Sequence, residues 1–383
     1  MAAFLLRRLV QGLATLWVVI TLSFTLMRLA PGGPFDREKP LPPAVAANLK
    51  RTFGLAADVK APFAGVLVRH AVQSGAEVAE GAPLAVLRTP SGEQTVLAER
   101  DLTVVSVVGE PGFAYKKGDP LTVRETSVLE QYLASLSSYA RLDLGVTFAS
   151  EGATRVTEAI GKTFPVSLEM GLYAVTLALL LGVSIGLLAG LRRNTWIDYT
   201  SMTLALVAVS MSSIVLGPLL VLVFGVWLQW LPWGGWEAFS FRWDHLQVKI
   251  LPTVTLALVY AAWFARLTRA GMLDIVSQDF IRTARAKGLP EWRVVSRHAL
   301  RGAVLPAVSF LGPALAGIVT GSVVVERIFA VPGVGEYFVT AAVNRDYPMV
   351  MGTVVLYSTL LILANIAVDV AYAALDPRVR REA

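Results

Sequence analysis

The chain has 383 residues, of which 55% are hydrophobic, 16% are charged and none is cysteine, and its formal net charge is +6. Soluble domains carry roughly 25% charged residues, so this composition excludes an ordinary soluble globule and favours a membrane protein that includes a polar segment. The lack of cysteine excludes disulfides, thiolate metal ligands and thiol catalysis, and three scattered histidines argue against a histidine-based metal site.

Six stretches of the sequence are apolar over the roughly 20 residues that a bilayer-spanning helix needs. They are Leu9–Leu29, Val166–Leu191, Thr200–Val223, Ile250–Ala265 with a continuation to Arg269, Val304–Val325 and Val350–Ala374. The first stretch is longer than the apolar core of a signal peptide, and Arg28 with the proline-containing run 31–34 is unlike a cleavage site. The sequence therefore predicts six transmembrane helices, the first of them retained.

The segment between the first two spans, residues 30–164, divides into three parts. Residues 31–57 are rich in proline and then helical in pattern, and residues 126–164 return to a helical pattern of apolar residues. Residues 58–125 have strand character and contain an internal repeat with an offset of 37 residues. Two sets of positions match across this offset: Gly75, Val78, Gly81, Pro83, Leu84 and Val86, and Gly112, Tyr115, Gly118, Pro120, Leu121 and Val123.

Glycines at fixed offsets suit turns with positive φ, and alternating apolar residues suit half-buried strands, so the repeat predicts a pseudo-twofold β unit. Over most of residues 59–124 this unit resembles the lipoyl/biotinyl-type β-sandwich. Carriers of that family hold their modified lysine in the hairpin between the two halves, here residues 88–94, which contain no lysine. The resemblance thus implies a rigid accessory or docking module, or a site for a binding protein or envelope partner, without lipoyl or biotinyl attachment.

Lys and Arg residues near the span ends fall mainly on one side of the predicted membrane. That side carries fifteen, including eight between residues 266 and 301, whereas the short loops of the opposite side carry four. The positive-inside rule places the richer side in the cytoplasm, so both termini are expected inside and residues 30–164 outside. The net positive charge then reflects membrane topology rather than nucleic-acid binding.

The most informative loop is the basic one between the fourth and fifth spans, residues 277–301. The sequence of this loop predicts a short helix, a break at Gly288 and a second helix. The second helix begins near Pro290 and leads past His298 into the fifth span. Small residues at positions 283, 284 and 286 would let another backbone approach closely. Such a two-part element suits docking in a partner's groove, and charge bias alone does not produce its ordered run Thr-Ala-Arg-Ala-Lys-Gly-Leu-Pro.

This loop resembles the coupling motif of ABC-importer permeases, in the form typical of peptide permeases. Arg282 stands at the usual glutamate position and Thr283 at the first alanine, departures that resemble the peptide/nickel subfamily. The resemblance covers residues 1–57 and 126–383 and points to the B-type permease subunit of oligopeptide or dipeptide importers. It is also carried by short motifs at residues 28–32, 164–167, 231–232, 332–335, 344–347 and 376–378.

The resemblance implies an all-α polytopic membrane protein of the ABC-importer permease type, with a small lipoyl-like β-sandwich inserted outside the membrane. Domains are then expected at residues 1–57, 58–125, 126–164 and 165–383. It implies a bacterial inner-membrane subunit that pairs with a second permease, two cytoplasmic ATPases and a periplasmic peptide-binding protein, and translocates peptides by alternating access. The chain itself is expected to bind no cofactor or metal and to hydrolyse nothing, since ATP and Mg²⁺ belong to the ATPases.

Two groups of site residues follow from the resemblance. Coupling to the ATPases is expected at Arg282, Thr283, Ala284, Ala286, Gly288, Leu289, Pro290 and His298. A translocation path or outer vestibule is expected at Glu169, Pro332, Gly333, Gly335, Asn344 and Asp346. For the intramembrane acid Glu169, contact with the interface or a partner helix is the competing interpretation, and Asp369 is expected to pair locally at a helix end.

Three alternative functions stay open at this point. A secondary transporter or channel would need inverted repeats, broken helices or paired intramembrane charges, and the spans show no convincing repeat. A membrane scaffold or export adaptor is suggested only by residues 58–125. An ABC importer for another solute, such as nickel chelates, would share the coupling loop. Phosphate-binding loops are excluded, because the segments around residues 161–163 and 333–335 lack the required glycines.

Overall fold

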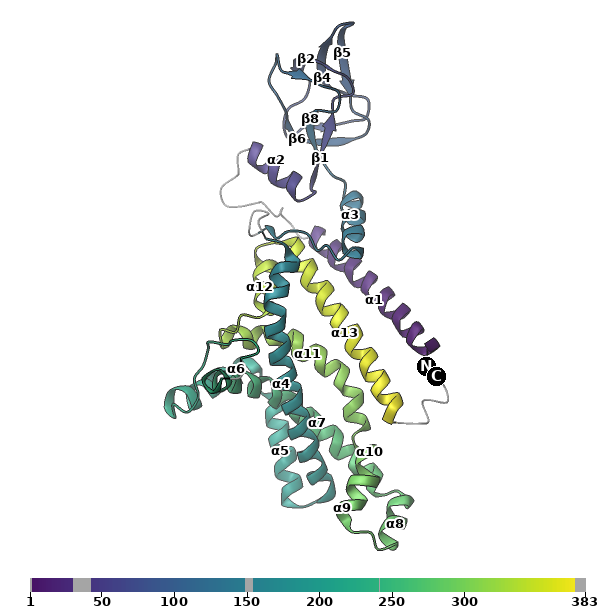
Figure 1. The fold of residues 1–383 in the computed structure, drawn as a ribbon, viewed down its shortest axis with the longest axis vertical. Helices are drawn as coiled ribbons and strands as arrows, with labels where there is room; N and C mark the ends of the chain where they lie inside the picture. Colours follow the sequence, from purple (N-terminus) through teal and green to yellow (C-terminus); the bar gives the residue numbers. More distant parts are fainter. Residues whose placement is uncertain (1, 30–42, 149–153, 241, 376–383) are drawn as a thin grey trace. The chain divides into compact units, whose positions relative to one another are not determined.

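The structure, a computed structural model, describes residues 2–29, 43–148, 154–240 and 242–375. Most of these residues are helical, and a group of strands lies between residues 56 and 125 (Figure 1). The chain divides into two units, a helical unit of residues 1–23, 159–340 and 351–383 and a second unit of residues 24–158 and 341–350. The motif positions 30–32 and 376–378 and the basic residues at the C-terminus lie outside the described residues.

The six predicted spans each have a helical counterpart. Four helices are individually long and apolar enough to cross a membrane: α1 (Ala2–Leu29), α4 (Val156–Leu191), α7 (Trp243–Val276) and α13 (Tyr347–Leu375). Two bent pairs raise the number to six if each pair is one span. The first, bent by 105°, joins α5 (Trp196–Ser210) to α6 (Ser213–Leu220) and the π-helix η2 (Val221–Trp227). The second, bent by 49°, joins α9 (Glu291–Arg293), the π-helix η3 (Val294–Ala299) and α10 (Leu300–Ala303) to α11 (Leu305–Ile328).

The third predicted span is wrong as one continuous helix. Met211 is extended and ends α5, and Ser212 starts the next helix by accepting a hydrogen bond from the Ile214 N–H at 3.3 Å. No proline or glycine precedes this break in α5, so the apolar composition predicts an unbroken helix. The fourth span, in contrast, continues beyond Arg269 and ends at Val276.

The helical unit has a buried core to which α4, α7 and α11 contribute most of the side chains. α4 approaches α7 through Gly182, Gly186 and Gly190, which recur every four residues and therefore share one helix face. A Cβ atom on Gly186 would lie 2.5 Å from the backbone oxygen of Ala265 and 2.7 Å from Cβ of Thr268. Small residues at this spacing let membrane helices pack backbone against backbone.

Ion pairs also join helices of this unit. Arg269 of α7 binds the buried Asp198 of α5 with two hydrogen bonds, at 2.5 and 2.8 Å. Asp369 of α13 pairs with Arg8 of α1 at 2.9 Å. The expectation of local pairing for Asp369 is therefore wrong, because its partner lies on a different helix.

Residues 56–125 form two antiparallel four-stranded sheets, ordered β1-β8-β6-β3 and β5-β4-β2-β7. Their strands are β1 (Ala56–Lys60), β2 (Gly65–His70), β3 (Glu77–Val78), β4 (Pro83–Thr89), β5 (Gly92–Leu97), β6 (Leu102–Val107), β7 (Ala114–Tyr115) and β8 (Pro120–Glu125). Buried side chains of both sheets meet in two clusters, one including Leu87 and Leu121 and the other Leu84 and Val104. We call these eight strands the β unit.

The predicted internal repeat is confirmed by the strand arrangement. A shift of 37 residues maps β1, β2, β3 and β4 onto β5, β6, β7 and β8, respectively. When each strand in the order β1-β8-β6-β3 is replaced by its repeat partner, the order of the other sheet, β5-β4-β2-β7, results. Backbone hydrogen bonds follow the same exchange, since Gly81 donates to Ala98 at 2.8 Å and Gly118 donates to Ala61 at 2.9 Å. Gly81 and Gly118 have φ angles of +80° and +95°, as predicted for these turns.

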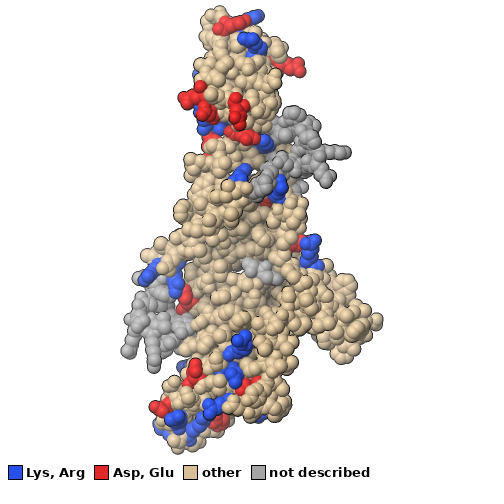
Figure 2. Space-filling view, turned by 180° about the vertical axis from the view of Figure 1, so that it is seen from behind, with Lys and Arg blue, Asp and Glu red and all other residues tan. Residues whose placement is uncertain are grey.

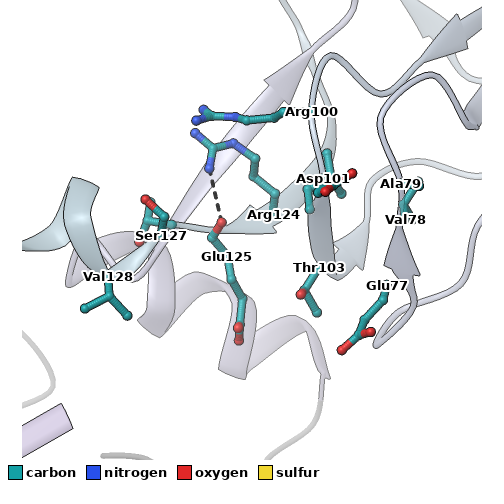
Figure 3. A pocket seen from close by; sticks show the side chains of 12 residues that line it. Glu77, Val78, Ala79, Arg100, Asp101, Thr103, Arg124, Glu125, Ser127 and Val128 are labelled. Atoms are coloured by element: carbon teal, nitrogen blue, oxygen red, sulfur yellow. Dashed lines mark hydrogen bonds between the residues drawn. The ribbon is translucent and has the colours of Figure 1, made fainter.

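The helix α3 (Val128–Ala140) is joined to the β unit by an ionic cluster. Glu130, which forms a capping box with Ser127 at the start of α3, also accepts hydrogen bonds from Arg100 at 2.6 Å and Arg124 at 3.0 Å. Figure 3 shows these two arginines side by side at a pocket of about 640 Å³. Hydrogen bonding from Arg124 lowers the pKa of Glu130 from 4.5 to about 2. α2 (Pro43–Thr52) is joined to the same sheet, because Lys50 binds Glu125 of β8 at 2.5 Å.

The lowered pKa of Glu130 predicts that the ionic contact between α3 and the β unit depends on pH. The carboxylate stabilises the folded state fully above its unfolded-state pKa near 4.5, and the contribution is lost as the pH falls toward 2. We expect Glu130→Gln to reduce the difference in hydrogen-exchange protection of α3 between pH 5 and pH 3 in the full-length chain. Glu93→Gln, which removes an exposed carboxylate from the same β unit, is the control and should keep the wild-type difference. Equal pH profiles for wild type and Glu130→Gln would contradict the prediction.

Candidate functional site

The predicted helix, break and second helix of the basic loop are present as α8 (Asp279–Ala286), Gly288 and the α9–η3 segment (Figure 1). Gly288 has a φ of +73°, a conformation that glycine adopts without strain. Its N–H donates to the Arg285 carbonyl at 2.9 Å, and Pro290 caps α9. The Arg285 guanidinium binds Glu291 across the break, at 2.6 and 3.2 Å. The two helical parts are therefore held as one element, which we call the loop element.

One face of the loop element packs against the membrane helices. Ile281 and Ala284 are buried with Val294 of η3 and Met272 near the end of α7, and Leu289 packs at the edge of this cluster. Ala284, which we expected at a docking surface, is only 6% exposed. The close approach that its small side chain permits is therefore to this chain's own residues. This inner face fixes the loop element to α7.

The outer face of the loop element carries other predicted coupling residues. Exposed there are Arg282, Thr283, Ala286, Gly288 and Pro290, while His298 is half-buried. Two large aromatic residues that sequence analysis missed lie nearby, Phe280 at 49% and Trp292 at 66% exposure, with Arg293 stacked 5.1 Å from the Trp292 ring. Figure 2 shows Lys and Arg side chains gathered at this end of the helical unit. Exposed aromatics beside arginine are typical of residues that anchor protein interfaces.

A buried carboxylate that sequence analysis missed fixes the predicted vestibule turn. Glu326 of α11 is fully buried and accepts hydrogen bonds from the Ser167 hydroxyl at 2.6 Å and the Gly335 N–H at 2.9 Å. The Ser167 oxygen in turn accepts a hydrogen bond from the Val334 N–H at 2.9 Å. A side chain on Gly333 would collide with the carboxylate. Two sequence motifs, one ending at Ser167 and one forming the turn, therefore meet at Glu326.

Glu169 lies inside the helical unit, paired with Lys249 of α7. The two charged groups are 2.7 Å apart, and each side chain is 3% exposed. The carboxylate also accepts hydrogen bonds from the Tyr173 hydroxyl at 3.0 Å, the Trp236 indole at 3.3 Å and the Phe239 N–H at 2.9 Å. Each carboxylate oxygen therefore has partners within this chain.

The remaining vestibule candidates differ in their surroundings. Pro332 is exposed and precedes α12 (Val334–Val343). In the second unit, Asn344 is exposed, whereas Asp346 is buried and accepts hydrogen bonds from the Thr147 hydroxyl and from the Met349 N–H at the start of α13. Within the described ranges, no group of three or more His, Cys, Asp or Glu side chains could hold a metal ion.

Sequence comparisons relate this chain to known transport proteins. Residues 182–381 match the profile of the family described as binding-protein-dependent transport system inner membrane component. The chain is 38% identical over 380 residues to the oligopeptide transport system permease protein OppB of Salmonella typhimurium, covering 99% of this chain and 100% of that protein. It is 33% identical to the dipeptide transport system permease protein DppB of Bacillus subtilis, covering 99% and 98% of the two chains.

A solved structure is similar over part of the chain. It shows inward-facing conformations of the MetNI methionine ABC transporter, with a TM-score of 0.47, 20% sequence identity, and coverage of 57% of this chain and 97% of that one. The profile match covers more than half of this chain, and the permease relatives align along nearly all of it. The chain therefore belongs to the family of binding-protein-dependent transport system inner membrane components and is a multi-pass inner-membrane protein.

Proposed function

We propose that this chain is a permease subunit of an ATP-driven peptide importer. The observation that carries the proposal is the loop element, whose inner face is fixed to α7 while its outer face exposes Phe280, Trp292 and several basic residues. A displacement of the outer face would therefore be transmitted to the membrane helices as a movement of packed elements. Relatives named for oligopeptide and dipeptide transport support a peptide as the substrate.

The proposal implies three kinds of partner protein. A second homologous permease completes the pore, two cytoplasmic ATPases dock on the outer face of the loop element, and a periplasmic binding protein delivers the peptide. ATP and Mg²⁺ are held by the ATPases, whose closure drives the permease pair between inward-open and outward-open states. The distribution of Lys and Arg supports cytoplasmic termini and a periplasmic location of residues 30–164.

The turn held by Glu326 is proposed to form part of the outer vestibule. Ser167 and Gly335 bind the two oxygens of the Glu326 carboxylate, so the turn keeps a fixed position on α4 and α11. Asn344 and Asp346 remain candidates on the evidence of the sequence motif alone. A role for Glu169 in lining the path would require its pair with Lys249 to open, because both groups are enclosed.

The β unit is proposed to be an inserted lipoyl-type β-sandwich that serves as a rigid accessory or docking module. Its first and last strands pair with each other, with Ala56 opposite Glu125, as expected for an insertion. The hairpin at residues 88–94 contains no lysine and is closed by hydrogen bonds of the Thr89 hydroxyl to Ser91 and Gly92, both at 2.9 Å. These features support docking rather than carriage of a covalently bound cofactor.

The variant Gly288→Val tests the coupling proposal. A β-branched residue is strongly disfavoured at the φ of +73°, by roughly 1–2 kcal/mol, so the break should change shape and misalign the outer face. We expect ATPase subunits to co-purify with the wild-type chain when the importer genes are expressed together. Gly288→Val should lose the ATPases or uncouple ATP hydrolysis from peptide. Gly288→Asn, whose side chain tolerates this conformation, is the matched control and should behave like wild type.

Two results would contradict the proposal. If no ATPase accompanies the wild-type chain and both variants behave alike, the coupling assignment is wrong and a secondary transporter becomes the better interpretation. If the ATPases bind but reconstituted vesicles take up nickel chelates instead of peptides, the importer assignment holds and the substrate assignment fails.

A further inference from the structure

Arg28, near the end of α1, is a cation to which the described part of the chain supplies no counter-ion. Its guanidinium carbon lies 5.4 Å from the centre of the Phe24 ring and 5.3 Å from the centre of the Tyr347 ring. Among the residues that the structure describes, the guanidinium forms no ion pair and no hydrogen bond. The rings stabilise its charge but provide no carbonyl or carboxylate oxygen, so its N–H donors stay available for such an acceptor.

Two of the motifs that carry the family resemblance meet at this cation. Arg28 begins the motif at residues 28–32, and Tyr347 ends the motif at residues 344–347. The second motif also contains Asp346, a vestibule candidate, but this acid does not neutralise Arg28. Asp346 is 2% exposed, and its carboxylate accepts hydrogen bonds from other groups of the chain. The vestibule motif therefore brings an aromatic ring to Arg28 and leaves its charge uncompensated.

The helix α3 adds two more aromatic residues to these surroundings (Figure 1). The Phe24 ring packs on Tyr132 of α3, with their centroids 5.4 Å apart, and Tyr139 of the same helix interacts electrostatically with Arg28. Burial raises the pKa of Tyr139 to about 12, so this residue is a neutral phenol and supplies no negative charge. All of these residues belong to the second unit, where aromatic side chains hold the guanidinium without satisfying it.

The position of Arg28 on α1 favours a water-soluble anion over a lipid headgroup. Leu22, Leu26 and Leu29 are 56%, 65% and 74% exposed and share one face of α1, which suits contact with lipid. Arg28 instead follows Phe24 by four residues, and Phe24 is 7% exposed on a different face. Arg28 is itself half-buried, so its charge lies among protein groups and away from the leucine face.

We propose that Arg28 binds the C-terminal carboxylate of the transported peptide. The inference rests on the proposed function and names the part of the substrate that this chain recognises. Peptides of any sequence carry this carboxylate, which accepts two parallel hydrogen bonds from a guanidinium. Charged residues that face the interior of a membrane protein commonly mark a substrate route. The contacts with Phe24 and Tyr347 already hold the guanidinium in place, so binding a carboxylate there costs little further side-chain freedom.

The test compares a peptide with its C-terminal amide in the complete importer, reconstituted in vesicles with its binding protein and ATPases. Trialanine and trialanine amide differ only at the group assigned to Arg28, and kcat/KM for uptake is measured for both. We expect Arg28→Gln to lower the value for trialanine by roughly tenfold, the effect of a hydrogen bond between charged groups, and to leave the amide within about twofold of wild type. The binding protein is the same throughout, so its own preference between the two peptides cancels.

Two further variants control for charge and for folding. Arg345→Gln removes the same charge from an exposed arginine of the 344–347 motif and should leave the values for both peptides unchanged. Arg28→Lys keeps the charge but cannot form two parallel hydrogen bonds, so it should lower the trialanine value selectively, by about threefold. This conservative variant decides the case in which the Arg28→Gln complex does not assemble.

The outcomes separate this inference from the proposed function. A loss confined to trialanine supports the assignment of Arg28. Unchanged values for both peptides, or equal losses for trialanine and its amide, overturn it and leave peptide import intact. A loss seen in vesicles that contain phosphatidylglycerol but not in pure phosphatidylcholine also overturns it, because Arg28 then binds a lipid phosphate. Failure of the binding protein to bind the Arg28→Gln complex overturns it in favour of a contact with that protein. If the wild type takes up neither peptide, the proposed function itself fails.

Discussion

Replacing Gly186 with leucine is expected to destabilise the helical unit strongly. The first side-chain atom would already lie 2.5 Å from the Ala265 backbone oxygen, and a leucine adds three more carbon atoms beyond it. Because backbone atoms of α7 form the obstacle, no side-chain rotation relieves the clash and the two helices must separate. Overpacking of this kind costs about 1–3 kcal/mol, with the upper end expected here.

The measurement is the thermal stability of the purified chain in detergent, monitored as the fraction that stays monodisperse after heating. Gly161→Leu is the matched control, since Gly161 lies on the same helix and has no atom within 4 Å of its added Cβ position. The control should melt at or above the wild-type temperature, because glycine is a poor helix former. Equal melting temperatures for the two variants would show that α4 and α7 do not pack closely at Gly186.

Replacing Lys249 with methionine is expected to have an effect of similar or larger size. Glu169 would keep its hydrogen bonds from Tyr173, Trp236 and Phe239 but would lose its counter-ion while 3% exposed. Removing one partner of a buried ion pair costs about 3–5 kcal/mol, because the other charge is left uncompensated.

A double-mutant cycle separates this charge effect from a packing effect. Lys249→Met combined with Glu169→Gln removes both charges and should recover much of the stability that the single substitution loses. Arg8→Met is the control, because it breaks the pair of Arg8 with Asp369, whose side chains are 44% and 27% exposed, and should cost below about 1 kcal/mol. If Lys249→Met is as stable as Arg8→Met, Glu169 is not held as a buried ion in the folded chain.

Features that depend on nearby residues could be predicted from the sequence. The 37-residue repeat predicted the turns at Gly81 and Gly118, because a tight turn depends mainly on the glycine within it. The break at Gly288 was predictable for the same reason. Span positions followed from apolar composition, but composition does not encode whether a span is straight, so the break at Met211 was missed.

Contacts between distant residues could not be predicted. Glu326 directly precedes Arg327 at the end of an apolar run and looks like any charge that flanks a span, and Ser167 comes 159 residues earlier. The face of a helix that turns inward could not be predicted either. Thr283 and Ala284 are neighbours in α8, yet one is exposed and the other buried, because the position of α7 decides which face of the short helix turns inward.

The first and last strands of the β unit pair with each other, and this has a practical consequence. The Thr126 N–H donates to the Leu55 carbonyl at 3.1 Å, so the chain returns to within one hydrogen bond of its point of departure. A stretch with such closely spaced ends behaves as a removable cassette, because a few residues could bridge the gap at a small entropic penalty. Deletion of residues 56–125, or their exchange for a fluorescent protein whose termini lie close together, should leave the transmembrane topology of the helices unchanged. The same geometry would allow such a cassette to be gained or lost in a single genetic event.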